Sequence, residues 1–170
     1  MASERTYSVV VACDEGGGIG YKNMLPWKVK EDLLFFRKLT SGSNSPGREN
    51  TVIMGRKTYE SLPNGPLKNR TNIVVTGRSF NDVMCADSFD AALDLAPMGG
   101  DVFAIGGKRV FEEALQDSRC KTVYITKIHG EHQCDVFISL DLSKYQLADK
   151  TETARSSSGI EFHRERWVRI

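Results

Sequence analysis

Residues 51–58 read TVIMGRKT, in which an apolar run ends at a glycine and a polar segment follows. The apolar run predicts a short strand at Thr51–Met54, and the segment after the glycine predicts a short helix at Arg56–Leu62. The same succession recurs at Asp101–Ile105 and Arg109–Gln116, with two glycines between them. A strand that leads into a helix twice in one chain favours a parallel sheet with helices packed on its faces.

The rest of the chain continues this alternation until its C-terminal part. Helical spacing predicts helices at Lys30–Thr40 and Ser88–Leu95, the second with Ser88 as its N-cap. Valine- and isoleucine-rich runs predict strands at Tyr7–Ala12, Asn72–Thr76, Val83–Ala86 and Thr122–Ile128. The tail predicts a hairpin of Gln146–Thr153 and Ile160–Ile170 around a serine-glycine turn. We therefore predict one α/β domain over residues 1–170, with three layers, a mostly parallel central sheet and an antiparallel C-terminal edge hairpin.

Two polar segments are predicted to be loops. Glu15–Asn23 contains four glycines, which predicts a mobile loop. Ser41–Gly47 is rich in serine, glycine, asparagine and proline. Because periodic segments resume directly on both sides of it, we interpret it as a surface loop and not as a linker between domains.

The composition argues against several classes of protein. The 170 residues carry a formal net charge of +1, with 26% charged residues, and this balance offers no electrostatic footprint for nucleic acid or an anionic membrane. The strongly apolar runs Val9–Ala12 and Leu33–Phe36 are far shorter than the roughly 20 residues that span a bilayer. The N-terminus has no hydrophobic signal core. We expect a cytoplasmic protein with neither nucleic-acid nor membrane partners.

The cysteines and histidines do not form a recognisable metal motif. The four cysteines include no C-x-x-C pair, and we interpret them as reduced thiols. His129, His132 and Cys134 lie close together in the sequence, but their spacing fits no familiar zinc pattern and Cys120 is far upstream. We expect no metal site.

Both strand-to-helix junctions have the chemistry of a phosphate site. Each places a glycine at the end of an apolar strand and cations at the start of a helix, in Gly55-Arg56-Lys57 and in Gly107-Lys108-Arg109. Free N–H groups and the helix dipole favour an anion there, and glycine allows close approach to the backbone. The alternative is that the glycines only turn the chain and the cations are solvated. Two such junctions favour the phosphates of a dinucleotide, although the chain lacks a G-x-G-x-x-G fingerprint and a P-loop.

Asp32 stands on the apolar side of the predicted helix Lys30–Thr40. It shares a face with Phe36, four residues later, and Leu33 follows it directly. A carboxylate in such surroundings is costly unless a partner satisfies it. One interpretation is an ordinary acid of the first helical turn, like its neighbour Glu31, which the helix dipole favours. The functional interpretation is a carboxylate that hydrogen-bonds a planar, nitrogen-rich ring between Leu33 and Phe36.

The order of short motifs along the chain resembles that of the dihydrofolate reductase family. The motifs are Val9–Ala12, Gly18-Ile19-Gly20, Leu25-Pro26-Trp27, Asp32-Leu33 with Phe36, Val52–Thr58, Pro66–Arg70, Ile105-Gly106-Gly107, Thr126 and Asp135. Each is weak alone, but the ordered set is specific and covers essentially the whole chain. The segment Ser41–Asn50 is longer than in compact bacterial members and is more similar to eukaryotic ones. The resemblance implies the family's fold and the NADPH-dependent reduction of 7,8-dihydrofolate to tetrahydrofolate, which supports one-carbon metabolism and thymidylate synthesis.

The resemblance also implies roles for individual residues at the substrate site. Asp32 would hold the amino-amide edge of the pterin with Thr126 behind it, and Arg70 would pair through its planar fork with the glutamate α-carboxylate. Leu25 and Trp27 join Asp32 as the implied catalytic positions. The other implied substrate contacts are Val10, Val11, Leu33, Phe36, Ser61, Leu62, Leu67 and Ile105.

The implied NADPH site covers four regions of the sequence. The nicotinamide would lie against Ala12, Ile19, Gly20, Asn23 and Leu25. The adenine-side phosphates would meet Gly55, Arg56, Lys57 and Thr58, and the adenosine would lie near Thr76 and Arg78. The pyrophosphate would be carried by Gly106, Gly107, Lys108, Arg109, Val110 and Phe111. Gly106-Gly107 resembles the family's cis glycine pair.

Three positions depart from the family pattern. Phe111 stands where the family commonly has tyrosine. Residues 136–139 read VFIS after Asp135, where the family usually has Thr-x-Phe-Pro, which affects a structural hydrogen bond and not the chemistry. Gly77 stands where a polar or basic side chain often meets the 2′-phosphate, and Arg78 is the expected substitute.

The residues favour a mechanism without covalent or metal steps, since no Ser-His-Asp set or reactive cysteine motif is present. Asp32 is expected to be the one ionisable group of the pocket. As an anion it would favour a protonated or polarised pterin, with a water delivering the proton, while the Glu15–Asn23 loop and Leu25 close over the nicotinamide.

Two other functions are considered. A reductase of a riboflavin-precursor pyrimidine would leave Arg70 without a carboxylate partner. A non-enzymatic pterin- or NADPH-binding module is disfavoured by the intact Asp32 and Leu25-Pro26-Trp27. We expect a monomer, or one domain of a longer reductase–thymidylate synthase chain.

Overall fold

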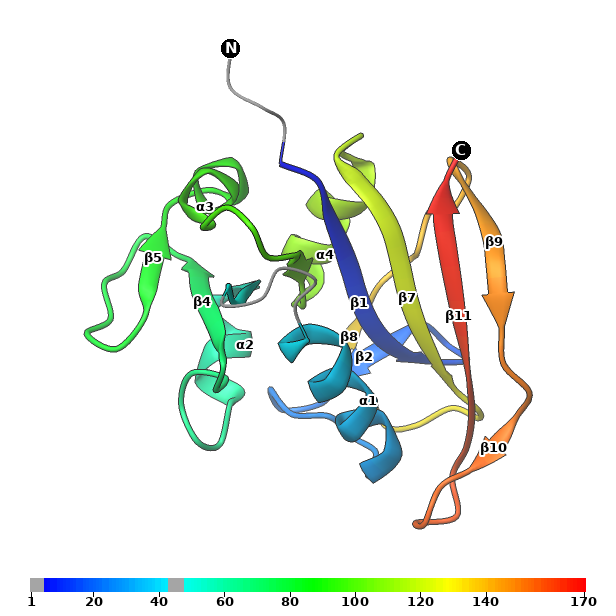
Figure 1. The fold of residues 1–170 in the computed structure, drawn as a ribbon. Helices are drawn as coiled ribbons and strands as arrows, with labels where there is room; N and C mark the ends of the chain where they lie inside the picture. The colour runs from blue at the N-terminus through cyan, green and yellow to red at the C-terminus, as the bar shows by residue number, and fades with distance from the viewer. Residues whose placement is uncertain (1–4, 43–47) are drawn as a thin grey trace.

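Parallel strands form the centre of the fold (Figure 1). The structure is a computed structural model, and it describes residues 5–42 and 48–170. Across the sheet the parallel strands follow the order β7, β1, β6, β3, β4, β5. Their bounds are β1 Tyr7–Asp14, β3 Asn50–Gly55, β4 Arg70–Val75, β5 Met84–Ala86, β6 Val102–Ala104 and β7 Cys120–Ile128. The predicted parallel sheet is confirmed, with strand ends that differ by at most two residues.

The C-terminal part of the chain adds an antiparallel edge. Strand β11, Glu161–Arg169, pairs antiparallel with β7, and both β9, Tyr145–Lys150, and β10, Ala154–Arg155, pair with β11. The predicted edge hairpin is therefore confirmed. Figure 1 shows this edge beside β7, on the side of the sheet where the chain ends.

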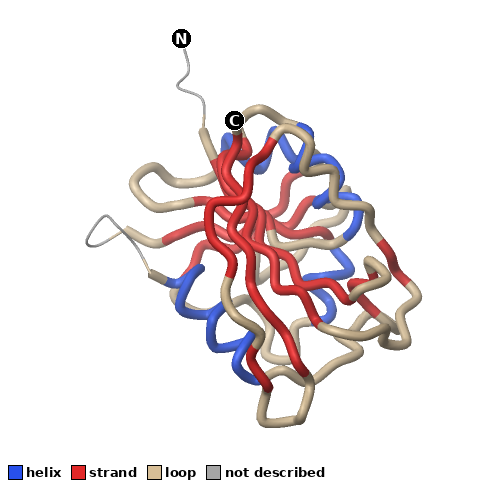
Figure 2. The backbone as a smooth tube through the Cα atoms, turned by 90° about the vertical axis from the view of Figure 1, so that its right-hand side faces the viewer, coloured by secondary structure: helices blue, strands red, loops and turns tan. Residues whose placement is uncertain are grey.

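The described helices cover both faces of the sheet (Figure 2). Their bounds are α1 Lys30–Ser41, α2 Arg56–Ser61, α3 Phe89–Leu95 and α4 Lys108–Gln116. Strand residues alternate between the two apolar clusters under these helices, because successive side chains point to opposite faces. Val9 and Val11 pack with residues of α3 and α4, whereas Val10 packs in the cluster that contains α1 and α2 residues. This alternation confirms the three layers, and Ser88 caps α3 as predicted by accepting a hydrogen bond from the Ala91 N–H.

The glycine-rich segment differs from its prediction. A loop is predicted at Glu15–Asn23, and this is wrong for Gly18–Gly20, which form β2 and pair antiparallel with β8, Val136–Phe137. Glycine carries no strand propensity, so the local sequence gives no sign of this pairing. For the predicted loop Ser41–Gly47, residues 43–47 lie outside the described residues, and Ser41 is the last residue of α1.

None of the helices in the described residues has the length and apolar character needed to cross a membrane.

Asn50 joins three elements at the amino end of the sheet, and its side chain is fully buried. Its Nδ2 donates to the Thr40 carbonyl at 3.0 Å, and its Oδ1 accepts from the Asp101 N–H at 2.9 Å. We expect Asn50→Ala to lower the free energy of unfolding by about 2–3 kcal/mol, because one buried and one partly buried backbone group lose their partner. Urea denaturation measures this, with the exposed Asn81→Ala as the control. Equal losses for the two variants would contradict the assigned role.

Candidate functional site

Asp32 is a largely but not fully buried carboxylate in the first turn of α1, beside the sheet. Its side chain is 14% exposed, and its Oδ1 accepts a hydrogen bond of 2.6 Å from the hydroxyl of Thr126 on β7. Burial raises the pKa of the Asp32 carboxyl above its ordinary value, and the Thr126 hydrogen bond and the Arg164 cation oppose that rise. No described residue donates a hydrogen bond to Oδ2. The group therefore has an acceptor oxygen available for a ligand.

A second ionisable group lies beside Asp32. Arg164 of β11 places its Nε 3.8 Å from Asp32 Oδ1, with 23% of its side chain exposed. The prediction that Asp32 is the only ionisable group of the pocket is therefore wrong. Sequence reasoning missed Arg164 because residues 163–166 read HRER, a uniformly polar run that gives no indication of which side chains face inward.

Trp27 lies five residues before this carboxylate in the sequence and brings a buried donor. The residue is 5% exposed, and its ring meets that of His132 edge to face at 5.6 Å between centroids. Its Nε1 is buried, and no described residue accepts a hydrogen bond from it. A buried donor without a protein partner is what a bound water or ligand would satisfy. Leu25 precedes it and is 48% exposed, which leaves its side chain accessible for contact with a ligand.

The segment that carries Ile19, Gly20 and Asn23 is held by two carboxylates. Asp14 Oδ1 accepts from the Gly16 and Gly18 N–H groups, and its Oδ2 accepts from the His132 N–H at 2.8 Å. Asp135 donates its N–H to the Gly20 carbonyl and accepts from the Lys22 N–H at 2.9 Å.

Residues 136–139, which depart from the family pattern, still bind the segment that carries Ile19 and Gly20. Ile138 donates its N–H to the Gly17 carbonyl at 2.9 Å, so the departure at residues 136–139 leaves backbone contacts in place. The sequence analysis did not identify Asp14. The pattern that could have indicated its role is a carboxylate at the end of a strand, followed by glycines whose N–H groups need an acceptor.

An apolar wall lies on the Asp32 side of the sheet. Four predicted substrate residues pack in the same apolar cluster, namely Val10, Leu62, Leu67 and Ile105. Phe36 is half-buried on α1, whereas Leu33 is 58% exposed. The side chain of Val11 lies in the core on the opposite face, which leaves only its backbone for a ligand. The Ser61 hydroxyl donates back to the Thr58 carbonyl at 2.6 Å.

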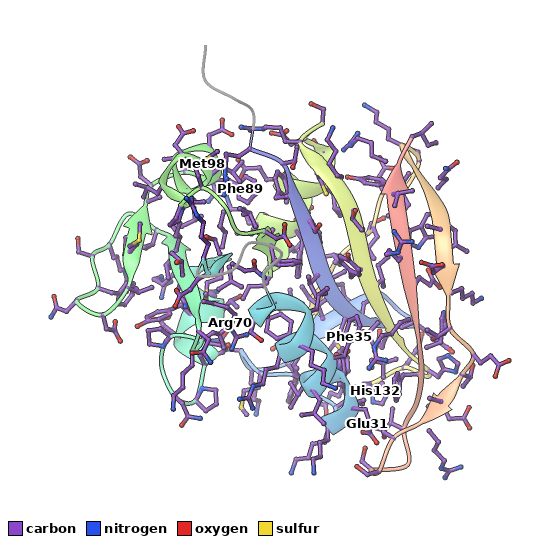
Figure 3. The ribbon with its side chains drawn as sticks, in the orientation of Figure 1. Glu31, Phe35, Arg70, Phe89, Met98 and His132 are labelled. Carbon is purple, nitrogen blue, oxygen red and sulfur yellow. The ribbon has the colours of Figure 1, made fainter. Side chains whose placement is uncertain are left out.

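Arg70 lies beside α1 with its guanidinium held by neutral oxygens (Figure 3). Nη1 donates to Thr40 Oγ1 and Nε donates to the Lys68 carbonyl, both at 2.9 Å. Among the described residues no carboxylate pairs with it, and burial, followed by the nearby Arg37 cation, lowers its pKa. The site therefore offers an oriented, partly desolvated cation to an external anion. Thr40 was missed, because nothing in its sequence context distinguishes it.

The two glycine junctions meet in space. Gly55 donates its N–H to the Gly106 carbonyl at 2.8 Å, and the Gly106–Gly107 peptide bond is cis, as the resemblance implies. A Cβ on Gly107 would lie 3.4 Å from Thr58 Oγ1, so a side chain there would crowd the gap between α2 and α4. Phe111 packs its ring tip against Gly106 from the core side.

The N-termini of α2 and α4 differ from those of the other helices. Each has a glycine N-cap, and neither has an acid in its first turn, as far as the described residues go. By contrast, α1 and α3 begin with Glu31, Asp32 and Asp90. A phosphate binds to free N–H groups that have no acid beside them. The N-termini of α2 and α4 therefore suit the phosphates of a dinucleotide.

The predicted cations around these junctions are mostly exposed. Lys57, Lys108 and Arg109 are exposed, and Arg56 pairs with Glu60 at 2.7 Å across one turn of α2. Val110 is buried and contributes to the core. Arg56 would therefore have to share its guanidinium with Glu60 if it met a phosphate.

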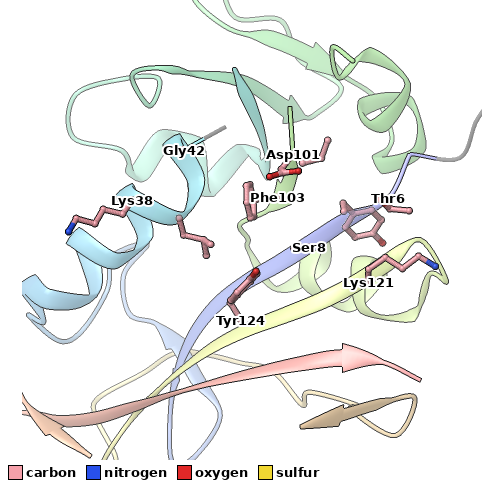
Figure 4. A pocket seen from close by; sticks show the side chains of 11 residues that line it. Thr6, Ser8, Lys38, Gly42, Asp101, Phe103, Lys121 and Tyr124 are labelled. Carbon is pink, nitrogen blue, oxygen red and sulfur yellow. The ribbon is translucent and has the colours of Figure 1, made fainter. Parts of the chain in front are cut away.

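Two hollows lie at opposite ends of the parallel strands. One of about 470 Å³ lies after β4 and β5 and is lined by Thr76, Gly77, Arg78 and Ser79, which puts the predicted adenosine residues in a concave site. The other, of about 530 Å³, lies near the amino ends of β1, β6 and β7 and includes Lys38 and Tyr124 (Figure 4). It contains none of the predicted site residues. The carboxyl-end location is where open α/β sheets bind their ligands.

Comparison with known proteins agrees with this geometry. A family model described as dihydrofolate reductase matches residues 6–169. The chain is 35% identical over 175 residues to a dihydrofolate reductase of Aedes albopictus, covering 93% of this chain and 94% of that protein. It is 39% identical over 155 residues to a dihydrofolate reductase of Schistosoma mansoni, covering 84% of this chain and 83% of that protein.

A longer relative shows the same similarity over part of its length. The chain is 39% identical over 165 residues to a bifunctional dihydrofolate reductase-thymidylate synthase of Paramecium tetraurelia, covering 95% of this chain. It spans 34% of the length of that protein. The family match over nearly the whole chain shows that this chain belongs to the dihydrofolate reductase family.

Proposed function

We propose that this chain reduces 7,8-dihydrofolate to tetrahydrofolate with NADPH. The observation that carries the proposal is the partly buried Asp32 carboxylate, fixed by Thr126 at 2.6 Å, with Oδ2 free of described donors and an apolar wall beside it. A carboxylate in that position suits a flat ring with adjacent N–H donors, because both its charge and its hydrogen-bonding capacity need a partner. The direct test is whether reduced-nicotinamide absorbance falls when dihydrofolate is added to protein and NADPH.

The rest of the folate molecule fits the neighbouring residues. The half-buried Phe36, Leu62 and Leu67 suit the pterin and benzoyl rings. Arg70, oriented by Thr40 and free of carboxylate partners among the described residues, suits the glutamate α-carboxylate. A riboflavin-precursor pyrimidine has no such carboxylate, so Arg70 favours the folate substrate.

The cofactor site would be built from the two glycine junctions and the hollow after β4 and β5. The N–H groups at the start of α4, with Gly106, Gly107 and Thr58, would bind the pyrophosphate, and Thr76 and Arg78 would bind the adenosine side. When bound, NADPH supplies the hydride for the imine carbon. The exposed Leu25 and the segment held by Asp14 would exclude water from the nicotinamide.

The chain's own residues would handle the proton. Ionised Asp32 would bind the amino-amide edge and raise the basicity of the neighbouring imine nitrogen. The buried Trp27 Nε1, without a described acceptor, would orient a water at this edge. That arrangement would let solvent supply the proton while Asp32 stays an anion.

The proposal also covers the domain organisation, location and oligomeric state of the protein. We propose that residues 1–170 make one reductase domain that works in the cytoplasm, as a monomer or as the reductase part of a longer chain. Standalone and bifunctional relatives of similar identity support both forms.

Asp32→Asn is expected to lower kcat at neutral pH by about 10²-fold or more, because the amide keeps the shape and loses the charge. Its fold should be at least as stable as wild type at pH 7. Because the pKa of Asp32 is raised in the folded protein, ionisation of this group lowers the free energy of unfolding as pH rises from its unfolded pKa to its folded pKa. Asn does not ionise, so the variant avoids this loss. Rates across pH and thermal melting at pH 7 and below about pH 4 check both parts. Near-wild-type rates at neutral pH would remove Asp32 from the mechanism.

Arg70→Lys is expected to raise KM for dihydrofolate about tenfold with little change in kcat, because an ammonium cannot reproduce a bidentate guanidinium–carboxylate pair. Dihydropteroate, which lacks the glutamate, provides the control, since its KM should be the same for both proteins. An unchanged KM for dihydrofolate would show that Arg70 does not hold the tail.

Arg78→Ala is expected to lower the preference for NADPH over NADH by about tenfold or more, because a charge-assisted contact to the 2′-phosphate is lost. The exposed Lys121→Ala, at the opposite end of the strands, is the control. The measurement is the ratio of kcat/KM for NADPH to kcat/KM for NADH. An unchanged ratio in Arg78→Ala would mean that another cation binds the 2′-phosphate.

A further inference from the structure

Arg164 shares a row of the sheet with Thr126, the residue that hydrogen-bonds the catalytic carboxylate. In the strand registers, Ala12 of β1 faces Thr126 of β7, and Thr126 faces Arg164 of β11. Residues directly opposite each other across neighbouring strands point to the same face. The row therefore brings Arg164 to the side of the sheet on which Thr126 binds Asp32.

The guanidinium of Arg164 is held on several sides. Its Cζ lies 4.2 Å from the centroid of the Phe35 ring and 5.1 Å from that of Phe162. Its Nη2 donates to the Glu31 carbonyl at 3.2 Å, which ties it to the first turn of α1. Figure 3 shows Glu31 and Phe35 on this helix. Because the charge is stacked and anchored, it stays near Asp32 and does not swing into solvent.

One donor of this anchored group has no partner. The Arg164 Nε is buried, and no described residue accepts a hydrogen bond from it, although Asp32 Oδ1 lies 3.8 Å away. The distance is too long for a hydrogen bond but short for an interaction between opposite charges with limited solvent. Arg164 therefore acts on Asp32 mainly through its charge.

The other elements around Asp32 contribute no second cation within the described residues. On α1, the Glu31 carboxylate accepts a hydrogen bond from the Ser157 N–H through Oε2, and its Oε1 is buried without a partner. From β7 the neutral Thr126 hydroxyl reaches Asp32, and the buried Trp27 ahead of α1 is also neutral. Arg164 is thus the charge that opposes the effect of burial on Asp32.

We propose that Arg164 is a positioning residue of the reductase site, whose fixed charge sets the upper end of the pH range in which the site holds the catalytic proton. This inference rests on the proposed function. In that reaction the imine carbon gains a hydride from NADPH, the imine nitrogen gains a proton from solvent, and NADP⁺ is released. Asp32 is an anion both before and after the reaction. A fixed cation beside Asp32 disfavours every state with an additional proton. The site should therefore lose that proton at a lower pH than it would without Arg164.

Arg164→Met keeps the aliphatic stem and removes the charge. We expect the alkaline limb of the pH profile for the hydride-transfer step to move up by about one pH unit, which is tenfold in proton affinity. Arg164→Lys keeps a charge and should leave the limb near its wild-type position. Single-turnover rates with NADPH deuterated at the transferred position isolate the step. A shift in Arg164→Lys as large as that in Arg164→Met would mean that packing, and not charge, is responsible, and would overturn the proposal.

A matched control lies on the same strand. Arg166 is two residues further along β11 on the same face and pairs with Asp149 at 2.7 Å. Arg166→Met should leave the limb unchanged. Arg164→Gln, neutral and of similar length, carries the test if Arg164→Met does not fold.

A second measurement separates this proposal from the proposed function. Carbon-13 NMR of labelled aspartate follows the Asp32 carboxyl in the ligand-free protein, where no turnover is needed. Its pKa should be higher by about one unit in Arg164→Met or Arg164→Gln than in wild type. An unchanged titration would overturn the role of Arg164 whatever the activity. If wild type does not oxidise NADPH with dihydrofolate at any pH, the proposed function fails, while the titration still measures the coupling of Arg164 to Asp32.

Discussion

The hydrogen bond between Thr126 and Asp32 is the interaction on which the organisation of this site depends. It joins the first turn of α1 to the middle of the sheet and keeps a carboxylate where water cannot fully solvate it. Burial raises the pKa of this carboxyl, and the Thr126 hydroxyl together with the Arg164 cation opposes that rise. A site for a planar, donor-rich ring follows, because Oδ2 still needs a partner. The position of α1 over the sheet is therefore a functional constraint as well as a packing one.

A second constraint comes from the order of the strands. Strands β3 and β6 are neighbours, so the glycines that follow them meet, and the Gly55 N–H bonds the Gly106 carbonyl. Two helix N-termini with free donors are thereby brought to one end of the sheet. The substrate wall lies on the face that Val10 shares with α1, while Val11 and Phe111 pack on the other. The proposed cofactor and substrate sites are thus separate consequences of one sheet topology and of the alternation of side chains along its strands.

Most of the fold was predictable, and the misses have physical reasons. Apolar runs and glycine stops located the parallel strands, and Ser88 marked the start of α3, because those signals act over a few residues. The pairing of Gly18–Gly20 with Val136–Phe137 was missed, since glycine has no strand preference and its partner is over a hundred residues away. At the site, Asp32 was singled out from its place on an apolar helix face, whereas Arg70 was implied only by the resemblance to the family. Arg164, Asp14 and Thr40 were missed because their roles arise from contacts between distant segments.

The sequence by itself determined the α/β class and the positions of the helices and strands. It also determined which functional groups are available, namely one acid among apolar residues, a planar guanidinium and two glycine junctions. Those properties depend on local propensity and side-chain type, which the order of residues specifies directly. Only the tertiary structure decided which of these groups meet. The register of β11 against β7 brings Arg164 to Asp32, and a shift of one residue would turn that side chain to the other face. Register and helix packing are set by the burial of the whole core, so the electrostatics of the pocket follow from the complete fold and not from any single segment.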